Sequence, residues 1–239
     1  MQFILSKKRN YVTITLGEFM KKIETIIYDL DGTLIDTNDI IINSFRSTFK
    51  KFEPDKELTL EKIKTFIGPP LGTTFRNYTN DPFKIQDMID TYRSHYIENE
   101  KDNFHLYPGV LTTLNKLKQL GYKLAILTSK SREAATPSFQ RTGLSNYFDL
   151  FVCVDDVKNA KPHKDAVNTV LNQLHSSKEA IMIGDNKGDI LAGKNAGIYS
   201  AGVAWALKGS LHLQEANPDY ILKDMNDIFS ILKELEGEN

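Results

Sequence analysis

The stretch from residue 26 to residue 36, IIYDLDGTLID, constrains this chain more than any other. Its apolar start predicts a buried parallel strand that ends at Asp29 and Asp31. Ligands bind at the carboxyl ends of strands in open α/β sheets, so both carboxylates are expected in a ligand crevice. Strand alternation would place positions 29 and 31 on one face, where two carboxylates repel unless a proton or a cation lies between them. The alternative interpretation is an ordinary turn with capping aspartates.

Composition restricts the function classes. The 239 residues suffice for one large domain or two small ones, and 41% hydrophobic with 26% charged residues is typical of a globular protein. A formal net charge of -1 gives no electrostatic reason to expect nucleic acid or an acidic membrane surface as a partner. No apolar run approaches the ~20 residues of a membrane span, and no secretory signal is evident. We expect a cytoplasmic protein in which the single cysteine, Cys153, is buried and inert.

The first 19 residues show no clear periodic pattern and precede a second methionine, Met20. Our hypothesis is that translation naturally starts at Met20 and that residues 1–19 are an upstream extension. The alternative is an extra strand over residues 11–15 at a sheet edge.

Residues 38–105 show helical spacing of apolar residues and no strand pattern. A helix is expected over 38–52, a second one after Thr59, a break over 66–72, and more helix over about 83–96. The segment therefore predicts a small all-helical insert.

From residue 107 onward, strands alternate with helices. Strands are expected at 122–128, 151–154, 180–184, 199–203 and 220–222. Helices are expected at 110–120, 162–174 and 228–235. Two more are expected after the strands that end at 128 and 184. The first runs to about 143 with a kink or break at Pro137, and the second runs to about 195. This alternation predicts an α/β fold with a doubly wound, parallel, Rossmann-like sheet. The expected catalytic core spans 20–37 and 107–239, and the helical cap spans 38–106.

The string from Asp29 to Leu34, DLDGTL, resembles the nucleophile motif of the haloacid dehalogenase-like (HAD) phosphohydrolases. Three later strings match the further motifs of that family in the expected order. They are Leu127-Thr128-Ser129, Lys161-Pro162, and GDNKGD from Gly184 to Asp189. Each string is weak alone, since a strand end followed by Thr-Ser is also a common helix cap. All four in order identify the chain as a member of the family.

The resemblance implies residue roles. Asp29 would be the nucleophile that becomes an aspartyl-phosphate, and Asp31 would be the general acid and then the general base. Thr128 would bind the transferring phosphoryl group, and Lys161 would offset its charge. Backbone amides near Leu30, Thr128 and Ser129 would surround the phosphoryl oxygens.

The resemblance also implies a metal. Mg²⁺ would be held by the Asp29 carboxylate, the Asp31 backbone carbonyl, Asp185, and Asp189 directly or through water. Four acidic residues in one crevice require a cation, and an all-oxygen ligand set favours a hard ion such as Mg²⁺.

Three further strings resemble the branch of the family that holds PpaX-type inorganic pyrophosphatases and phosphoglycolate phosphatases. They lie at 36–45, 66–71 and 202–209. The best expectation is therefore a phosphohydrolase of a small phosphorylated metabolite, with inorganic pyrophosphate preferred. Candidate substrate-binding residues besides Leu30 and Ser129 are Lys130, Arg132, Arg76, Lys208 and the Gly68 loop.

Several alternatives stay open at this point. They are a phosphoglycolate phosphatase, a phosphomutase of the β-phosphoglucomutase type, and a non-catalytic phosphometabolite-binding protein. The expected partners are small molecules only, in a monomer or a homodimer.

Overall fold

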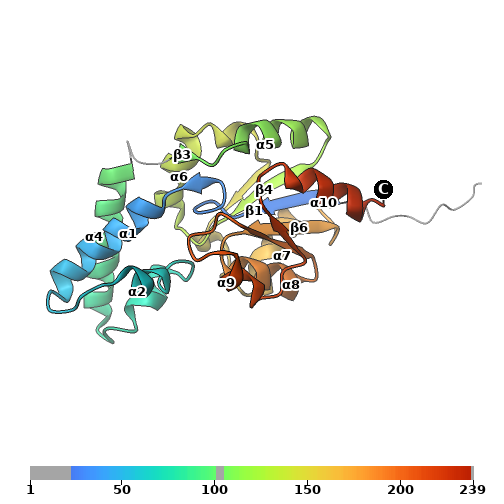
Figure 1. Cartoon of the computed structure of the whole chain (residues 1–239). Coiled ribbons are helices and arrows are strands. Elements are labelled where there is room, and N and C mark those ends of the chain that lie inside the picture. The colour runs from blue at the N-terminus through green and yellow to red at the C-terminus, as the bar shows by residue number, and fades with distance from the viewer. Residues whose placement is uncertain (1–22, 101–104, 238–239) are drawn as a thin grey trace, which may run out of the picture.

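A six-stranded sheet forms the centre of the protein (Figure 1). The computed structural model describes residues 23–100 and 105–237, so the predicted extension 1–19 and the alternative strand 11–15 lie outside the described residues. The strand order is β5-β4-β1-β6-β7-β8, and each neighbouring pair is parallel. The strands are β1 (Thr25–Tyr28), β4 (Lys123–Leu127), β5 (Leu150–Val152), β6 (Ala180–Gly184), β7 (Tyr199–Val203) and β8 (Tyr220–Leu222).

The motif strand β1 lies in the middle of this sheet, between β4 and β6. Tyr28 is in register with Ile126 of β4 and with Ile183 of β6. Parallel strands in register end at the same edge, so the residues after β1, β4 and β6 lie next to one another. The sheet topology thus brings together three motifs, the first and last of which are more than 150 residues apart in the sequence.

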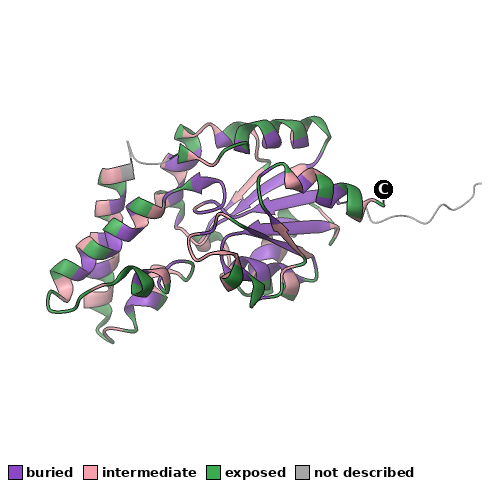
Figure 2. Cartoon of the chain, viewed as in Figure 1, coloured by how far each residue is buried: buried purple, intermediate pink, exposed green. Residues whose placement is uncertain are grey.

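Both faces of the sheet are covered by helices. Ile26 and Tyr28 pack in one hydrophobic cluster with α5 (Val110–Gln119) and α10 (Asp227–Leu235). Ile27 packs in a second cluster with α7 (Lys164–Gln173) and α8 (Lys187–Ala196). The strands are accordingly buried between two helical layers (Figure 2). The predicted doubly wound parallel α/β fold is confirmed.

A helical insert, which we define as α1 to α4, follows β1 and lies beside the sheet (Figure 1). It consists of α1 (Asn38–Phe52), α2 (Leu60–Lys64), α3 (Leu71–Phe75) and α4 (Pro82–Glu100). Its buried residues, including Phe45, Phe49 and Met88, form a hydrophobic cluster of their own. The side chain of Thr59 caps α2, as predicted, by accepting a hydrogen bond from the Lys62 amide.

A short antiparallel ribbon joins the insert to the rest of the fold. It pairs β2 (Ile35–Asp36) with β3 (His105–Leu106). The expectation of no strand within 38–105 is therefore wrong at its last residue, where a two-residue strand is too short to give a periodic pattern. The division into a core and a cap domain, with boundaries at 37 and 107, stays a prediction.

Other element boundaries also differ from the predictions. Pro137 lies inside α6 (Arg132–Arg141) and does not break it, since buried Ala135 and Phe139 hold both halves against the sheet. The helix expected from Pro162 begins instead at Lys164. The strand expected up to residue 154 ends at Val152.

Three short elements had no prediction, because one turn is too short to show periodicity. They are α9 (Ser210–Gln214) and the 3₁₀ turns η1 (Leu144–Asn146) and η2 (Val154–Asp156). Within the described ranges, none of the helices has the length and apolar character that crossing a membrane requires.

Candidate active site

A cavity of about 220 Å³ lies where the sheet edge meets the helical insert. The turns after β1, β4 and β6 line its sheet side, while α1, the loop 66–70 and α4 line the opposite side. The insert contributes mainly apolar side chains, such as Phe45, Ile67 and Tyr92. The cavity therefore has one strongly polar wall and one largely apolar wall.

Three buried carboxylates gather on the polar wall. Asp29 follows β1, Asp185 follows β6, and Asp189 lies in the first turn of α8. One oxygen from each carboxylate lies within 4.8 Å of the others, and the residues are only 7%, 4% and 2% exposed. Such a group of hard oxygen ligands could hold a divalent cation.

Lys161 is the cationic partner of this trio. Its Nζ donates hydrogen bonds to Asp29 Oδ1 at 2.7 Å, to Asp189 Oδ1 at 2.6 Å and to the Leu127 carbonyl at 2.8 Å. Burial alone would lower the lysine's pKa, but the charges of Asp189 and Asp29 outweigh burial and raise it. Lys161 is thus charged, and one positive charge faces three acidic groups.

The excess negative charge shifts the acids themselves. Burial raises the pKa of Asp29 to about 7, although the Lys161 charge lowers it and the Asp189 charge adds to the rise. Burial also raises the pKa of Asp185, with Asp29 and Asp189 adding to the effect. Asp29 therefore binds a proton near neutral pH unless another cation takes its place.

Two glycines allow the carboxylates to approach this closely. A Cβ on Gly184 would lie 2.3 Å from Asp189 Cγ, and a Cβ on Gly32 would lie 2.5 Å from Asp185 Oδ2. Gly32 also has a φ of 79°, which side chains rarely adopt. Glycine is therefore required at both positions by the acids next to them.

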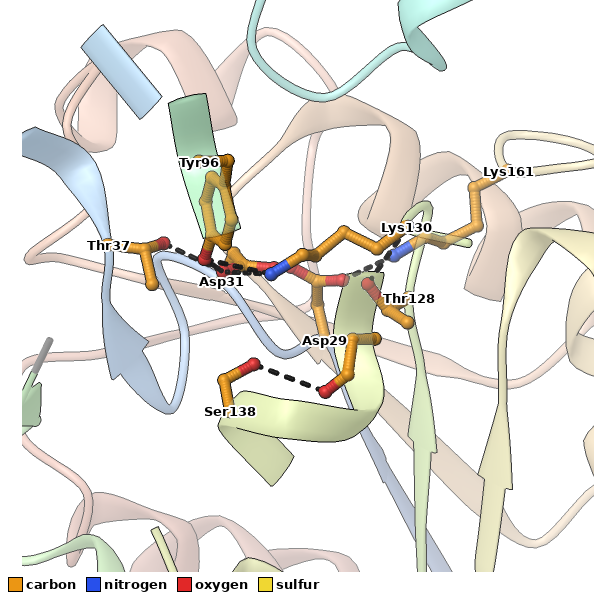
Figure 3. Close-up of polar contacts among 9 residues, drawn as sticks. Asp29, Asp31, Thr37, Tyr96, Thr128, Lys130, Ser138 and Lys161 are labelled. Carbon is orange, nitrogen blue, oxygen red and sulfur yellow. Dashed lines mark hydrogen bonds and ion pairs between the residues drawn. The ribbon is translucent and has the colours of Figure 1, made fainter. Parts of the chain in front are cut away.

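Asp31 faces the same cavity but belongs to a separate cluster (Figure 3). Thr37 and Tyr96 donate hydrogen bonds to its Oδ1 at 2.8 and 3.3 Å. Lys130 Nζ lies 3.3 Å from the carboxylate and donates a hydrogen bond to the Tyr96 hydroxyl at 2.8 Å. The second oxygen, Asp31 Oδ2, is buried and forms its ion pair with Lys130 Nζ at 3.3 Å without a hydrogen bond. These contacts fix the orientation of the carboxyl group.

The expectation that Asp29 and Asp31 share a face of one strand is wrong. The strand ends at Tyr28, and the chain turns back so that Leu34 and Ile35 donate hydrogen bonds to the Leu30 carbonyl. The turn, rather than strand alternation, brings Asp31 to the cavity. The Leu30 side chain is fully buried and does not line the cavity.

Three of the other predicted site residues also line the cavity. Thr128 and Ser129 line it directly after β4, and Thr128 Oγ1 accepts a hydrogen bond from the Lys130 amide at 3.2 Å. Gly68 lines it from the insert, with a φ of 109°. A Cβ there would lie 2.7 Å from Asn186 Oδ1, so only glycine lets this loop approach the sheet edge.

Three predicted substrate-binding residues do not line the cavity. The Arg132 side chain pairs with Asp156 and donates a hydrogen bond to the Phe151 carbonyl, so it binds the neighbouring loop. Arg76 is exposed at the end of α3. Lys208 Nζ donates hydrogen bonds at 2.7 Å to the Ile67 carbonyl and to Asn186 Oδ1, which ties the Gly68 loop to the sheet side.

Sequence reasoning missed several residues that line the cavity or order it. Arg93 and Tyr96 reach the cavity from α4, and Ser131 reaches it from the start of α6. The signal for the first two was available, because Arg93 and Tyr96 share one helical face with Ile89. An arginine within an apolar helical face indicates a polar neighbour on the facing element. No comparable signal marks Ser131.

Comparisons with known proteins agree with this geometry. Residues 26–203 match the family model described as haloacid dehalogenase-like hydrolase. A pyrophosphatase PpaX from Listeria monocytogenes is 42% identical over 216 residues, which cover 90% of this chain and 99% of the relative. A pyrophosphatase PpaX from Halalkalibacterium halodurans is 41% identical over 212 residues, covering 88% of this chain and 97% of the relative.

Solved structures show the same relationship. A haloacid dehalogenase-like family hydrolase from Streptococcus pneumoniae superposes with a TM-score of 0.76 at 29% identity, covering 87% of this chain and 98% of that structure. The four motifs resembling HAD enzymes all fall within the matched region, and three of them supply the buried carboxylates and the lysine described above. The chain therefore belongs to the haloacid dehalogenase-like hydrolase family and is a phosphatase of that family.

Proposed function

We propose that this phosphatase is an inorganic pyrophosphatase that depends on Mg²⁺ and works through an aspartyl-phosphate on Asp29. The observation that carries the proposal is the trio of Asp29, Asp185 and Asp189 around Lys161 at the wall of the cavity. The preference for pyrophosphate is supported by relatives about 41% identical, which are named pyrophosphatases.

The donor set fits a magnesium ion. Three buried carboxylates face one lysine, so a divalent cation would bring the charge of the group close to neutral. Asp29, Asp185 and Asp189 would hold it, and the Asp31 backbone carbonyl is the further predicted ligand. When bound, Mg²⁺ would offset the negative charge of the nucleophile and of the phosphoryl oxygens.

The protein residues would then carry the reaction in two steps. In the first step, an Asp29 oxygen forms a bond to phosphorus while the bridging P–O bond breaks, and the leaving phosphate takes a proton from Asp31. In the second step, Asp31 accepts a proton from water as the water oxygen attacks phosphorus, and the Asp29–phosphorus bond breaks.

Lys161, Thr128 and Ser129 would hold the transferring phosphoryl group. Lys161 already lies 2.7 Å from the nucleophile's Oδ1, so it would orient the carboxylate and offset the charge that repels an anionic substrate. Thr128 and Ser129 lie at the same end of the sheet, at the cavity wall.

Phosphate release with Mg²⁺ over a panel of pyrophosphate, phosphoglycolate, sugar phosphates and nucleotides tests this function. We expect pyrophosphate to have the highest kcat/KM, and Asp29→Asn to lower kcat at least about a thousandfold. Asp87→Asn, an exposed acid on α4, is the matched control. Full activity of Asp29→Asn would refute the assignment of Asp29 as the nucleophile. A preference for phosphoglycolate would indicate that the protein is a phosphoglycolate phosphatase instead. Isomer formation without phosphate release would indicate a mutase, and inactivity with tight binding would indicate a non-catalytic protein.

A further inference from the structure

Two side chains that line the cavity have polar groups that form no hydrogen bond or ion pair with the residues that the structure describes. Arg93 of α4 lines the cavity, is half-buried, and has no hydrogen bond or ion pair with any residue that the structure describes. Ser131 is 9% exposed and lines the same cavity, and its buried Oγ has no hydrogen-bond partner. Buried polar groups without partners cost folding free energy, so such groups in a cavity indicate a ligand.

Ser131 does not serve its usual structural purpose. It stands at the N-cap position of α6, yet its side chain accepts no hydrogen bond from that helix. The first amide of the helix, at Arg132, donates instead to Asp155 Oδ2 at 2.7 Å. The hydroxyl is therefore not accounted for by capping, and the helix terminus itself is already occupied by a carboxylate.

The charges of the cavity point to an anionic ligand for Arg93. Of the described residues that line the cavity, three are lysine or arginine. Lys161 is bound by Asp29 and Asp189, and Lys130 is bound by Asp31. Arg93 is the one among these three whose charge meets no carboxylate. An anionic group beyond the transferring phosphoryl group would find its counter-charge there.

We propose that Arg93 and Ser131 form a leaving-group subsite, which binds a second anionic group next to the phosphoryl group being transferred. The proposal rests on the proposed function and narrows its substrate class to small phosphates that carry a second phosphate or a carboxylate. Ser131 follows Thr128, Ser129 and Lys130 directly in the chain, so the two anion sites are adjacent. Asp31, held by Lys130, lines the same cavity, where the leaving oxygen needs a proton.

The apolar wall of the insert supports the same substrate class. Phe45, Phe66 and Ile67 have no side-chain groups that could form hydrogen bonds with a sugar's hydroxyl groups. Arg93 instead offers five N–H donors in a planar fork that matches two oxygens of one anion. The subsite would therefore select for charge at a short distance from the scissile bond.

Kinetics of the variants Arg93→Gln and Ser131→Ala with pyrophosphate and with phenyl phosphate test the subsite, since the phenol leaving group carries no second anion. Arg93→Gln should lower kcat/KM for pyrophosphate about ten- to hundredfold, mainly through KM, and Ser131→Ala about two- to tenfold. The loss with phenyl phosphate should be at least tenfold smaller for Arg93→Gln. Arg93→Lys should restore part of the activity, and Arg46→Gln, at an exposed arginine on α1 of the same insert, should match the wild type with both substrates. Equal losses with both substrates, or no loss with pyrophosphate, would overturn the subsite.

A binding experiment separates failure of the subsite from failure of the proposed function. Methylenediphosphonate and methylphosphonate are not hydrolysed, so their affinities with Mg²⁺ present can be measured by calorimetry without turnover. The wild type should bind the diphosphonate at least tenfold more tightly, and Arg93→Gln should lose that preference. A wild type that binds both equally overturns the subsite even if it hydrolyses phosphate esters. A preference that depends on Arg93 supports the subsite even if pyrophosphate is not the substrate.

Discussion

Replacing Lys161 by methionine tests the electrostatic account of the active site most directly. The side chain is 5% exposed, and its Nζ makes hydrogen bonds to Asp29, Asp189 and the Leu127 carbonyl at 2.6 to 2.8 Å. Methionine keeps much of the apolar stem and removes the charge. Asp29 and Asp189 would then be buried beside Asp185 with no cation, and the Leu127 carbonyl would lose a donor.

The expected loss of stability is large. Removing one partner of a buried ion pair typically costs about 3 to 5 kcal/mol, because the other charge stays buried and unpaired. For a chain of this size, 1 kcal/mol changes the melting temperature by roughly 2 to 4 °C, so the metal-free variant should melt about 6 to 20 °C lower. The control is Lys118→Met, which removes an exposed pair with Asp149 at 2.6 Å. An exposed pair is worth about 1 kcal/mol or less, so that shift should stay below about 4 °C.

The loss should depend on pH with a definite sign. Burial already raises the pKa of Asp29 to about 7, and the Lys161 charge lowers it, so methionine would raise it further. A carboxyl group whose pKa is higher in the folded than in the unfolded protein destabilises the fold as pH rises through that range. The melting difference between variant and wild type should therefore be small near pH 4 and largest above pH 7. Equal melting temperatures of the metal-free proteins at pH 8 would refute the reasoning.

Three further outcomes are expected. Gly184→Ala should abolish phosphatase activity while the circular-dichroism spectrum is retained, because a Cβ would lie 2.3 Å from Asp189 Cγ and displace that carboxylate; wild-type kcat would contradict this. Mg²⁺ binding should release protons and weaken as pH falls below 7, since the raised pKa of Asp29 leaves protons to displace; calorimetry in two buffers of different ionisation enthalpy measures this, and no proton release would contradict it. Lys208→Met should speed proteolysis of the loop next to Gly68, because Lys208 bonds that loop to Asn186; an unchanged cleavage rate would show that the contact does not hold the loop.

The sheet and the polar wall of the cavity could be predicted because their signals are local. β1, β4 and β6 are short and largely apolar, and a motif lies at the carboxyl end of each of these strands. Once the strands are parallel and neighbouring, the positions after them must meet. Asp29, Thr128 and Asp185 could therefore be placed together without any knowledge of side-chain contacts.

The opposite wall could not be predicted in the same way. Arg76 and Arg93 both lie in the insert, and Arg132 follows the second motif. Of these three arginines, only Arg93 lines the cavity. Which face of α4 meets the sheet edge depends on how the insert packs against the sheet. That packing involves contacts between residues more than 100 positions apart in the sequence, such as Lys208 with the Ile67 carbonyl. Arg132 has the right position but is bound by Asp156, which short-range patterns do not reveal.

The ribbon of β2 and β3 explains how a long insertion leaves the sheet order undisturbed. Ile35 lies opposite Leu106 and Asp36 opposite His105, so the chain leaves and returns at neighbouring points. The entropic cost of closing a loop grows only with the logarithm of its length. Once the ribbon of β2 and β3 forms, the number of residues in the insert therefore hardly affects the pairing of β1 with β4. A different set of helices could thus be joined at the ribbon while Asp29 and Asp31 keep their places after β1.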